Sequence, residues 1–448
     1  MDRGEVRRVT VAVRDLARAR VLYSDLLGMR EVSSWRFTAE EVALEPRAAR
    51  FAATLGLAEP EAIVGVDLEQ PGTSVGAVRL VHIGDGAGER INEGARPYDH
   101  GHVKNLDFFT DDVQGQYARF VGAGFEFLSP PVEYALPWGQ GALATEAHLP
   151  SEDGVKISLA RLAGVPRMAM GRSARETPFT EVAAATQVVK DFERAEAFLC
   201  EVLDLVPAAP TVIEGELIAA LRLPSGTRLR MSFLSGPRAA GGRVGIVAYE
   251  GPGVMDARTL APRLHAPHRG VLGLAFAVSD VEYATRRALA LGAALRGSPA
   301  PRSVAGVTSF GATVVSPEGI PLEFEEAAAL PEGESGNPPS ARDFVAIGPV
   351  GDFPEGSVRE HRPRDGSARL ALANVAGEIF AFEDRCPHLG APLSRGELRG
   401  RTLVCPWHAW MIDVPTGDVR GGRGASLRRC PARVRNGQVE VASLDTAS

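Results

Sequence analysis

VAVRDLARARVLYSDLLGM, residues 11–29, holds the pattern that decides the fold of most of this chain. A strand-like apolar run ends at Asp15, and apolar residues then recur at helical spacing, as at Leu16, Ala19 and Leu22. An aspartate directly after a strand is a good helix N-cap, because its carboxylate accepts hydrogen bonds from the first backbone amides of the helix. The stretch therefore predicts a strand followed at once by an amphipathic helix.

The same strand–aspartate–helix pattern occurs three more times. The repeats are FFTDDVQGQYARFVGAGFEF from residue 108, VVKDFERAEAFLCEVLDL from residue 188 and FAVSDVEYATRRALALGAAL from residue 276. Their capping residues are Asp112, Asp191 and Asp280. Short alternating apolar segments follow each helix, so each unit is predicted to be βαβββ. The first unit is most like the third and the second most like the fourth, which predicts two tandem halves of two units each.

This repeat resembles the vicinal oxygen chelate superfamily, which includes glyoxalase I, extradiol dioxygenases and bleomycin-resistance proteins. The resemblance covers about residues 5–326. It implies an α+β fold in which four βαβββ units form two vicinal-oxygen-chelate domains, at residues 1–162 and 178–326. Residues 327–341 are rich in Pro, Gly, Ser and Glu and are predicted to be a linker. Residues 342–448 are then predicted to form a separate all-β domain.

Two cysteines and two histidines near the end of the chain form its most specific motif. They are Cys386-x-His388, within CPHLGAPLS, and Cys405-x-x-His408, within CPWHAW. This donor set fits either a tetrahedral zinc site or an iron–sulfur cluster that takes one Cys and one His from each loop. The interleaved order of Cys and His favours the cluster.

The residues around this motif resemble a Rieske ferredoxin domain. The resemblance rests on the proline after each cysteine, on Leu389-Gly390 and on Asp413-x-x-Thr416-Gly417, and it extends from about residue 342 to 445. It implies a [2Fe-2S] cluster with Cys386 and Cys405 on one iron and the two histidines on the other. The loops lack the extra cysteine pair of respiratory Rieske proteins, which places the domain nearer the ferredoxins and ring-hydroxylating oxygenases. Ala409 stands where the family usually has glycine.

A second metal site is less well supported. Metal-binding members of the superfamily carry His near the start of the first strand of a unit and Glu in its last strand. Counting back from the capping aspartates gives Arg8, Asn105, Ala184 and Gly273 for the first strands, and Arg79, Ser158, Arg230 and Glu323 for the last. Only Glu323 keeps a ligand type, so the usual 2-His-1-carboxylate iron site is not supported. A salt-bridged strand residue is the simpler interpretation of Glu323.

Two alternatives remain open for this part of the chain. Glu146 and His148 lie two residues apart on an alternating strand, so both could point into one cavity. With Glu323 they are the weak candidates for catalysis, or for an additional mononuclear metal that the usual ligands do not support. If there is no metal, the candidates for binding an anionic or carbonyl-bearing substrate are Arg8, Arg79 and Asn105, at the vacated ligand positions.

The composition of the chain limits which kinds of binding partner are expected. The chain has 49 basic and 56 acidic residues, a net charge of −7 and no basic stripe, so no nucleic-acid partner is expected. No segment approaches the roughly 18 apolar residues of a membrane span, and the N-terminus has no signal-peptide core, which predicts a cytoplasmic protein. No GxGxxG motif opens a βαβ unit, so electrons are expected from an external, NAD(P)H-fed reductase.

A one-electron carrier fused to a small-molecule cavity predicts a redox enzyme. We expect a Rieske iron–sulfur oxidoreductase, with an oxygenase acting on an aromatic or polyketide-like small molecule as the leading hypothesis. The alternative is a metal-free binding module whose Rieske domain passes electrons to a separate oxygenase, and a third hypothesis is a redox sensor. The residues alone favour an enzyme without deciding the choice. Because a linker precedes the cluster domain, transfer between the subunits of a homo-oligomer is a further expectation.

Overall fold

The computed structural model describes most of the chain. The described residues are 5–73, 75–136, 142–163, 177–208, 210–236, 241–278, 280–304, 307–326, 344–362, 369–386, 390–407, 410–415, 417, 419–420, 427, 429–430, 432–435 and 437–442. They belong to two compact units, Met1–Ala327 and Ala328–Ser448. The predicted linker, 327–341, lies outside the described residues. None of the described helices is long and apolar enough to cross a membrane.

Each of the four aspartates predicted to begin a helix does so. In every case the carboxylate accepts a hydrogen bond from a backbone N–H in the first turn, which is the N-cap interaction expected from the sequence. The capped helices are α1 (Leu16–Arg20), α4 (Val113–Gly122), α5 (Phe192–Leu203) and α7 (Val281–Ala290), after Asp15, Asp112, Asp191 and Asp280. The fourfold repeat is therefore confirmed.

Each helix follows the first strand of its unit, and further strands come after it. The first unit has β1 (Val6–Ala12), β2 (Arg30–Phe37), β3 (Ile63–Glu69) and β4 (Ala77–Ile83), with α2 (Ala39–Leu44) and α3 (Pro46–Thr54) between β2 and β3. The second has β5 (His102–Phe109), β6 (Val132–Ala135), β7 (Leu143–Pro150) and β8 (Lys156–Ala163). The third has β9 (Ala184–Val188), β10 (Val206–Pro207), β11 (Thr211–Ile213), α6 (Glu216–Ala220), β12 (Arg228–Ser235) and β13 (Arg243–Glu250). The fourth has β14 (Gly270–Val278), β15 (Ala294–Val304), β16 (Val307–Val315) and β17 (Pro321–Glu326).

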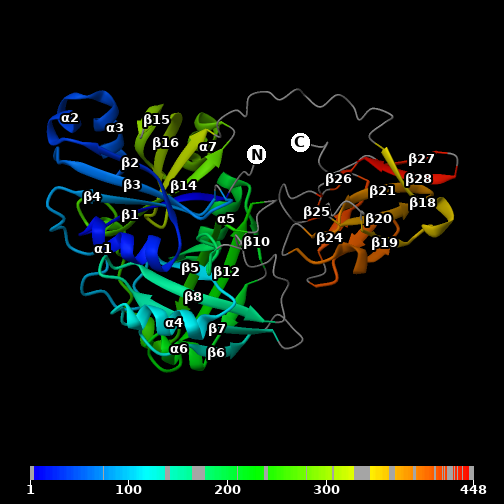
Figure 1. Ribbon diagram of the computed structural model, residues 1–448, viewed down its shortest axis with the longest axis horizontal. Coiled ribbons are helices and arrows are strands. Elements are labelled where there is room, and N and C mark those ends of the chain that lie inside the picture. The colour runs from blue at the N-terminus through cyan, green and yellow to red at the C-terminus, as the bar shows by residue number, and fades with distance from the viewer. Residues whose placement is uncertain are drawn as a thin grey trace. The chain divides into compact units, whose positions relative to one another are not determined.

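These strands form two sheets, and each sheet joins two units (Figure 1). The 1/4 sheet combines the first and fourth units in the order β15-β16-β17-β14-β1-β4-β3-β2. The 2/3 sheet combines the second and third units in the order β10-β12-β13-β9-β5-β8-β7-β6, with β11 paired to β12. In each sheet two first strands meet antiparallel, with Val9 opposite Leu274 in one and Leu106 opposite Ala185 in the other.

The sheets therefore do not coincide with the predicted halves, residues 1–162 and 178–326, because each half contributes one unit to each sheet. The sequence similarity between units predicts the βαβββ pattern of each unit. It does not predict which open strand edges pair, because those strands are far apart in the sequence. One apolar core contains buried residues of all four units, such as Val9, Phe108, Leu199 and Phe276. This shared core explains why the four units form a single compact body.

The second body is built from β-strands and short 3₁₀ turns in its described residues, as the sequence predicts. One sheet is β18 (Phe344–Pro349), β28 (Gln438–Ala442) and β27 (Ala432–Arg435). Another is β19 (Val358–His361), β20 (Leu370–Val375), β21 (Glu378–Glu383) and β26 (Arg429–Cys430). The third is β22 (Glu397–Arg399), β23 (Thr402–Val404), β24 (Met411–Asp413) and β25 (Val419–Arg420).

Candidate functional site

The 2/3 sheet borders a cavity of the first body, which we call the inner cavity. Its empty volume is about 690 Å³, including the space open to solvent at its mouth. The apolar lining includes Leu136, Leu162, Leu217, Met231 and Phe233. Helix α6 supplies part of this wall, and strands β12 and β13 supply another part. The cavity therefore offers an apolar surface to the body of an organic molecule.

Polar side chains gather on the sheet face of the same cavity. They are Asn105, Asp107, Tyr134, Glu146, His148, Lys156, Thr186 and Tyr249. Side chains two residues apart on a strand point to the same face. This alternation brings together Asn105 with Asp107 on β5 and Glu146 with His148 on β7, and the prediction that the β7 pair shares one cavity is confirmed.

Asp107 is a buried carboxyl group held in place by two neighbours. One oxygen, Oδ1, accepts a hydrogen bond from Asn105 Nδ2 at 2.6 Å, and Oδ2 accepts one from Thr186 Oγ1 at 3.0 Å. Burial raises the pKa of Asp107 to about 7, and the nearby charge of Glu146 adds to the shift. The side chain can therefore hold or release a proton near neutral pH.

Glu146 and His148 form a contact pair beside Asp107. Glu146 Oε1 accepts a hydrogen bond from Tyr134 at 2.9 Å, and its Oε2 lies 3.1 Å from His148 Nε2. Burial opposes the charge on Glu146, but its contacts with His148 and Tyr134 outweigh burial and lower its pKa. Burial lowers the pKa of His148 too, and the Lys156 charge contributes to that shift. Among the described residues, His148 Nδ1 has no hydrogen-bond partner.

Lys156 stands apart from the other polar groups. Lys156 is only 8% exposed, yet its amine forms no hydrogen bond or ion pair with the described residues. Burial lowers the pKa of Lys156 to about 8, although Asp107 and Glu146 favour the charged form. The ammonium group therefore keeps its proton at pH 7 without a direct partner.

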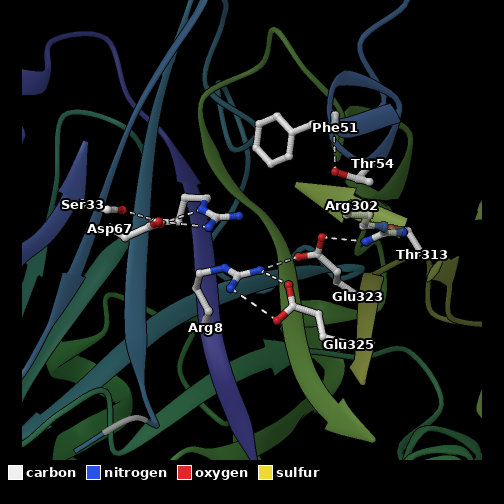
Figure 2. A network of polar contacts seen from close by, with 10 residues as sticks. Arg8, Ser33, Phe51, Thr54, Asp67, Arg302, Thr313, Glu323 and Glu325 are labelled. Carbon is white, nitrogen blue, oxygen red and sulfur yellow. Dashed lines mark hydrogen bonds and ion pairs between the residues drawn. The ribbon is translucent and has the colours of Figure 1, made fainter. Parts of the chain in front are cut away.

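The corresponding face of the 1/4 sheet is filled by its own side chains. Figure 2 shows Arg8 of β1 directed at Glu323 and Glu325 of β17. Arg8 Nη2 lies 3.1 Å from Glu323 Oε2, and Arg302 Nη1 donates to Glu323 Oε1 at 2.8 Å. Because two arginines contact Glu323, the simpler interpretation of this residue as a salt-bridged strand residue is confirmed.

A second ion pair lies in the 1/4 sheet. Arg79 donates to both oxygens of Asp67, at 2.6 and 3.0 Å, and Ser33 donates to Asp67 at 2.8 Å. The Arg79 guanidinium also lies 5.5 Å from the centre of the Trp35 ring and 5.6 Å from that of Phe51, within the range of cation–π attraction. Helix α3 carries Phe51 onto this face, and the pocket that Phe51 and Glu323 line there has an empty volume of about 290 Å³, less than half that of the inner cavity.

The structure separates the residues predicted to occupy vacated ligand positions. Arg8 and Arg79 lie in the 1/4 sheet and Asn105 in the 2/3 sheet, so the three do not meet at one spot. Arg230 was placed in a last strand, but it lies in β12, and β13 is the last strand of its unit. Among the described residues, no three His, Cys, Asp or Glu side chains are grouped as a metal site requires.

The polar residues of the inner cavity that the sequence analysis did not identify include Asp107, Lys156 and Thr186. Asp107 follows the counted position Asn105 by two residues, so strand alternation places both on one face. That signal was available in the sequence. Nothing local marks Lys156 or Thr186, because their proximity depends on the pairing of β5 with both β8 and β9.

The two cysteines of the cluster motif are held by backbone hydrogen bonds in the second body. Gly390 N donates to Cys386 O, and Cys386 N donates to Ala391 O, both at 2.8 Å. In the same way Cys405 N donates to Trp410 O at 2.8 Å. Both cysteines are buried. Two buried thiols, each held by backbone hydrogen bonds, fit the thiolate half of an iron–sulfur site; His388 and His408 lie outside the described residues.

Family models divide the chain as the fold does. Residues 6–158 and 181–324 match the model of the glyoxalase/bleomycin resistance protein/dioxygenase superfamily. The chain belongs to this superfamily. Residues 343–431 match the Rieske [2Fe-2S] domain, so this superfamily member carries a Rieske domain with a [2Fe-2S] cluster as its cofactor.

Known relatives match this superfamily member over its Rieske region. Human apoptosis-inducing factor 3 is 35% identical over 106 residues, which are 23% of this chain and 17% of the relative. The 3-phenylpropionate/cinnamic acid dioxygenase ferredoxin subunit of Escherichia coli K12 is 44% identical over 70 residues, 15% of this chain and 63% of the relative. The chain thus spans less than two thirds of these curated relatives. Among solved structures, glyoxalase I from Zea mays is 15% identical with a TM-score of 0.46, over 72% of this chain and 92% of that one.

Proposed function

We propose that this chain is a Rieske iron–sulfur oxidoreductase that acts on an aromatic or polyketide-like small molecule in the inner cavity. In the form we favour it is an oxygenase. The observation that carries the proposal is the inner cavity, where an apolar wall faces a set of ionisable groups. When bound, the cluster supplies single electrons. An external reductase fed by NAD(P)H provides these electrons. They can pass between the subunits of a homo-oligomer.

The residues of the inner cavity have separate parts in this proposal. The apolar wall, with Met231 and Phe233, holds the body of the substrate and excludes water from it. Reduction of oxygen consumes protons as well as electrons, so a group that titrates near neutral pH is needed close to the substrate. Asp107 has this property, because burial raises its pKa to about 7, and Asn105 and Thr186 fix its orientation.

The second candidate function is a binding module whose Rieske domain serves a separate oxygenase. Two observations favour it. The ligand positions counted in the 2/3 sheet include Asn105, Ser158 and Ala184, none of which is a usual iron ligand. One relative is named as the ferredoxin subunit of a dioxygenase.

A single-turnover experiment separates the two functions. Protein purified without oxygen is reduced with dithionite, desalted, and mixed with oxygenated buffer with or without a panel of aromatic acids and phenols. Absorption of the cluster gives the rate of its reoxidation, mass spectrometry detects oxidised product, and elemental analysis gives the iron content per chain. The Cys405→Ala variant, which loses a cluster ligand, is the control for reactions that do not use the cluster.

We expect a ligand to accelerate reoxidation of the cluster and to be oxidised in proportion to the electrons delivered, with no product from Cys405→Ala. Reoxidation that ignores every ligand, with product formed only after a second oxygenase is added, would overturn the proposal in favour of the alternative.

A further inference from the structure

A second pocket lies next to the inner cavity, and we call it the outer pocket. Its empty volume is about 850 Å³, including the space open to solvent. Lys156 and Leu221 line both spaces, so the outer pocket and the inner cavity meet at these two side chains. A ligand longer than one space can therefore extend past Lys156 into the other.

The outer pocket carries one sign of charge. Its lining includes Arg96, His102, Lys104, Lys156 and Arg222, and no Asp or Glu is present among its described lining residues. Arg96 contacts Asp99 and Asp256, so its charge is largely matched. Burial lowers the pKa of His102 to about 3, so its ring is neutral at pH 7, and burial also lowers the pKa of Lys104 well below its ordinary value. Lys156 keeps its proton at pH 7 and has no carboxylate among the described lining residues of the pocket, so it supplies a buried positive charge there.

Two side chains of this pocket retain unused hydrogen-bonding capacity. Lys156 forms no hydrogen bond or ion pair with the described residues, although its residue is 8% exposed. His102 is 6% exposed, and its Nδ1 has no partner among the described residues. Lys104, which lines the same pocket, already donates to Tyr249 at 2.8 Å and to Pro97 O.

The lysines are rare enough in this chain to single out the site. Only three of the 49 basic residues are lysines: Lys104, Lys156 and Lys190. Two of these three line the outer pocket. A lysine amine is compact and can enter a narrow buried space, whereas a guanidinium is broad and is suited to paired carboxylates such as those of the 1/4 sheet. The choice of lysine here fits a ligand anion that approaches from the cavity.

We propose that an organic carboxylate binds across the two spaces, with its anionic group on Lys156 and its apolar body against the inner cavity wall. The anion makes a charge-assisted hydrogen bond to the Lys156 ammonium group and offsets the cost of burying that group without a partner. The body reaches Met231 and Phe233, close to Asp107. Binding of the anion is independent of redox chemistry; its role as the substrate's recognition group rests on the proposed function.

Calorimetric titration of the whole, cluster-loaded protein tests this directly. The probes are 2-naphthoate, its neutral analogue 2-naphthamide, benzoate and inorganic phosphate. The variants are Lys156→Met, which keeps the length and removes the charge, Lys156→Arg, which restores a charge, and Lys190→Met, a matched control at the exposed third lysine. Circular dichroism melting curves confirm that each variant is folded.

We expect 2-naphthoate to bind about 10- to 100-fold more tightly than 2-naphthamide, the range expected for hydrogen bonds to a charged group. Lys156→Met should abolish that preference without changing the affinity for 2-naphthamide, Lys156→Arg should restore part of it, and Lys190→Met should leave it intact. Benzoate should bind more weakly than 2-naphthoate because it buries less of the apolar wall.

Three outcomes would overturn the proposal: equal binding of the acid and the amide, a preference that survives in folded Lys156→Met, or inorganic phosphate binding as tightly as 2-naphthoate. The last would indicate a site for free phosphate that makes no use of the apolar wall. Tight, charge-dependent binding without turnover would support the carboxylate site while contradicting the proposed oxidoreductase. Turnover of neutral ligands without any charge preference would support the proposed oxidoreductase and contradict the carboxylate site.

Discussion

The 1/4 and 2/3 sheets are built from the same repeated unit but treat buried charge in opposite ways. In the 1/4 sheet each buried arginine meets a carboxylate, as Arg8 meets Glu323 and Arg79 meets Asp67. In the 2/3 sheet the buried amine of Lys156 has no such partner, and it borders open space. Inserted helix α3 brings Phe51 onto the 1/4 face, whereas α6 lines the inner cavity without filling it.

This difference shows how a duplicated fold can divide two tasks. Charges that satisfy one another hold strands together and leave nothing for a ligand. Charges that remain unsatisfied make the folded state less stable, and they persist where a ligand or a reaction uses them. The 1/4 sheet is therefore interpreted as structural and the 2/3 sheet as functional. The following variants test that division.

The largest expected effect is on the 1/4 sheet. Replacing Arg8 with Met leaves the buried Glu325 without its cation, so the free energy of unfolding should fall by about 3–5 kcal/mol. Urea denaturation followed by circular dichroism measures the loss. The double variant Arg8→Met/Glu325→Met removes both partners and should recover much of the stability.

The matched change in the 2/3 sheet is Lys156→Met. Because burial lowers the pKa of Lys156, its charge opposes folding at pH 7, and removing it should leave stability unchanged or slightly raised. If Lys156→Met were as destabilising as Arg8→Met, the two sheets would not differ in the way described, and the distinction between a structural and a functional face would fail.

Local features of the fold could be predicted from the sequence, whereas the pairing of units could not. Asp15 and its three counterparts were identified as N-caps because the signal lies within a few residues of each helix. The pairing of β1 with β14 joins residues more than 250 positions apart, and no local pattern specifies it.

The candidate site shows the same limit. Glu146 and His148 were placed in one cavity correctly because strand alternation is local. The candidates Arg8 and Asn105 lie in different sheets, which the sequence could not show because it depends on which units share a sheet. Strand alternation with Asn105 could have placed Asp107 on the cavity face, but its raised pKa depends on its burial, which only the folded chain reveals.

The pH dependence of stability should distinguish the 2/3 sheet from the 1/4 sheet. An acid with a raised pKa binds its proton more tightly when folded, so Asp107 lowers stability as pH rises from about 4, the ordinary value of an aspartate, to about 7, and the loss then remains constant. Asp107→Asn cannot ionise. It should therefore be more stable than the original chain by about 2–4 kcal/mol at pH 8 and equal to it near pH 4.

Urea denaturation of both proteins at a series of pH values gives this difference. Asp67→Asn in the 1/4 sheet is the control with the opposite sign, because burial there is outweighed by Arg79, which keeps the pKa of Asp67 low. That variant should be less stable than the original at neutral pH. A difference between Asp107→Asn and the original chain that does not vary with pH would refute the assignment of a titrating carboxyl group at the inner cavity.

The smallest effect should be equal in the two sheets. Asp112 and Asp280 cap one helix each, α4 beside the 2/3 sheet and α7 beside the 1/4 sheet, and each accepts a hydrogen bond from a backbone N–H at 2.8 Å. Changing either to Ala should cost about 1 kcal/mol, whereas Asn, which keeps an acceptor oxygen, should cost little. Melting temperatures of the four variants give the comparison. Equal losses of stability would mean that the two sheets share one backbone framework and differ only in the side chains on their faces. A loss of stability confined to one sheet would mean that the framework itself differs between them.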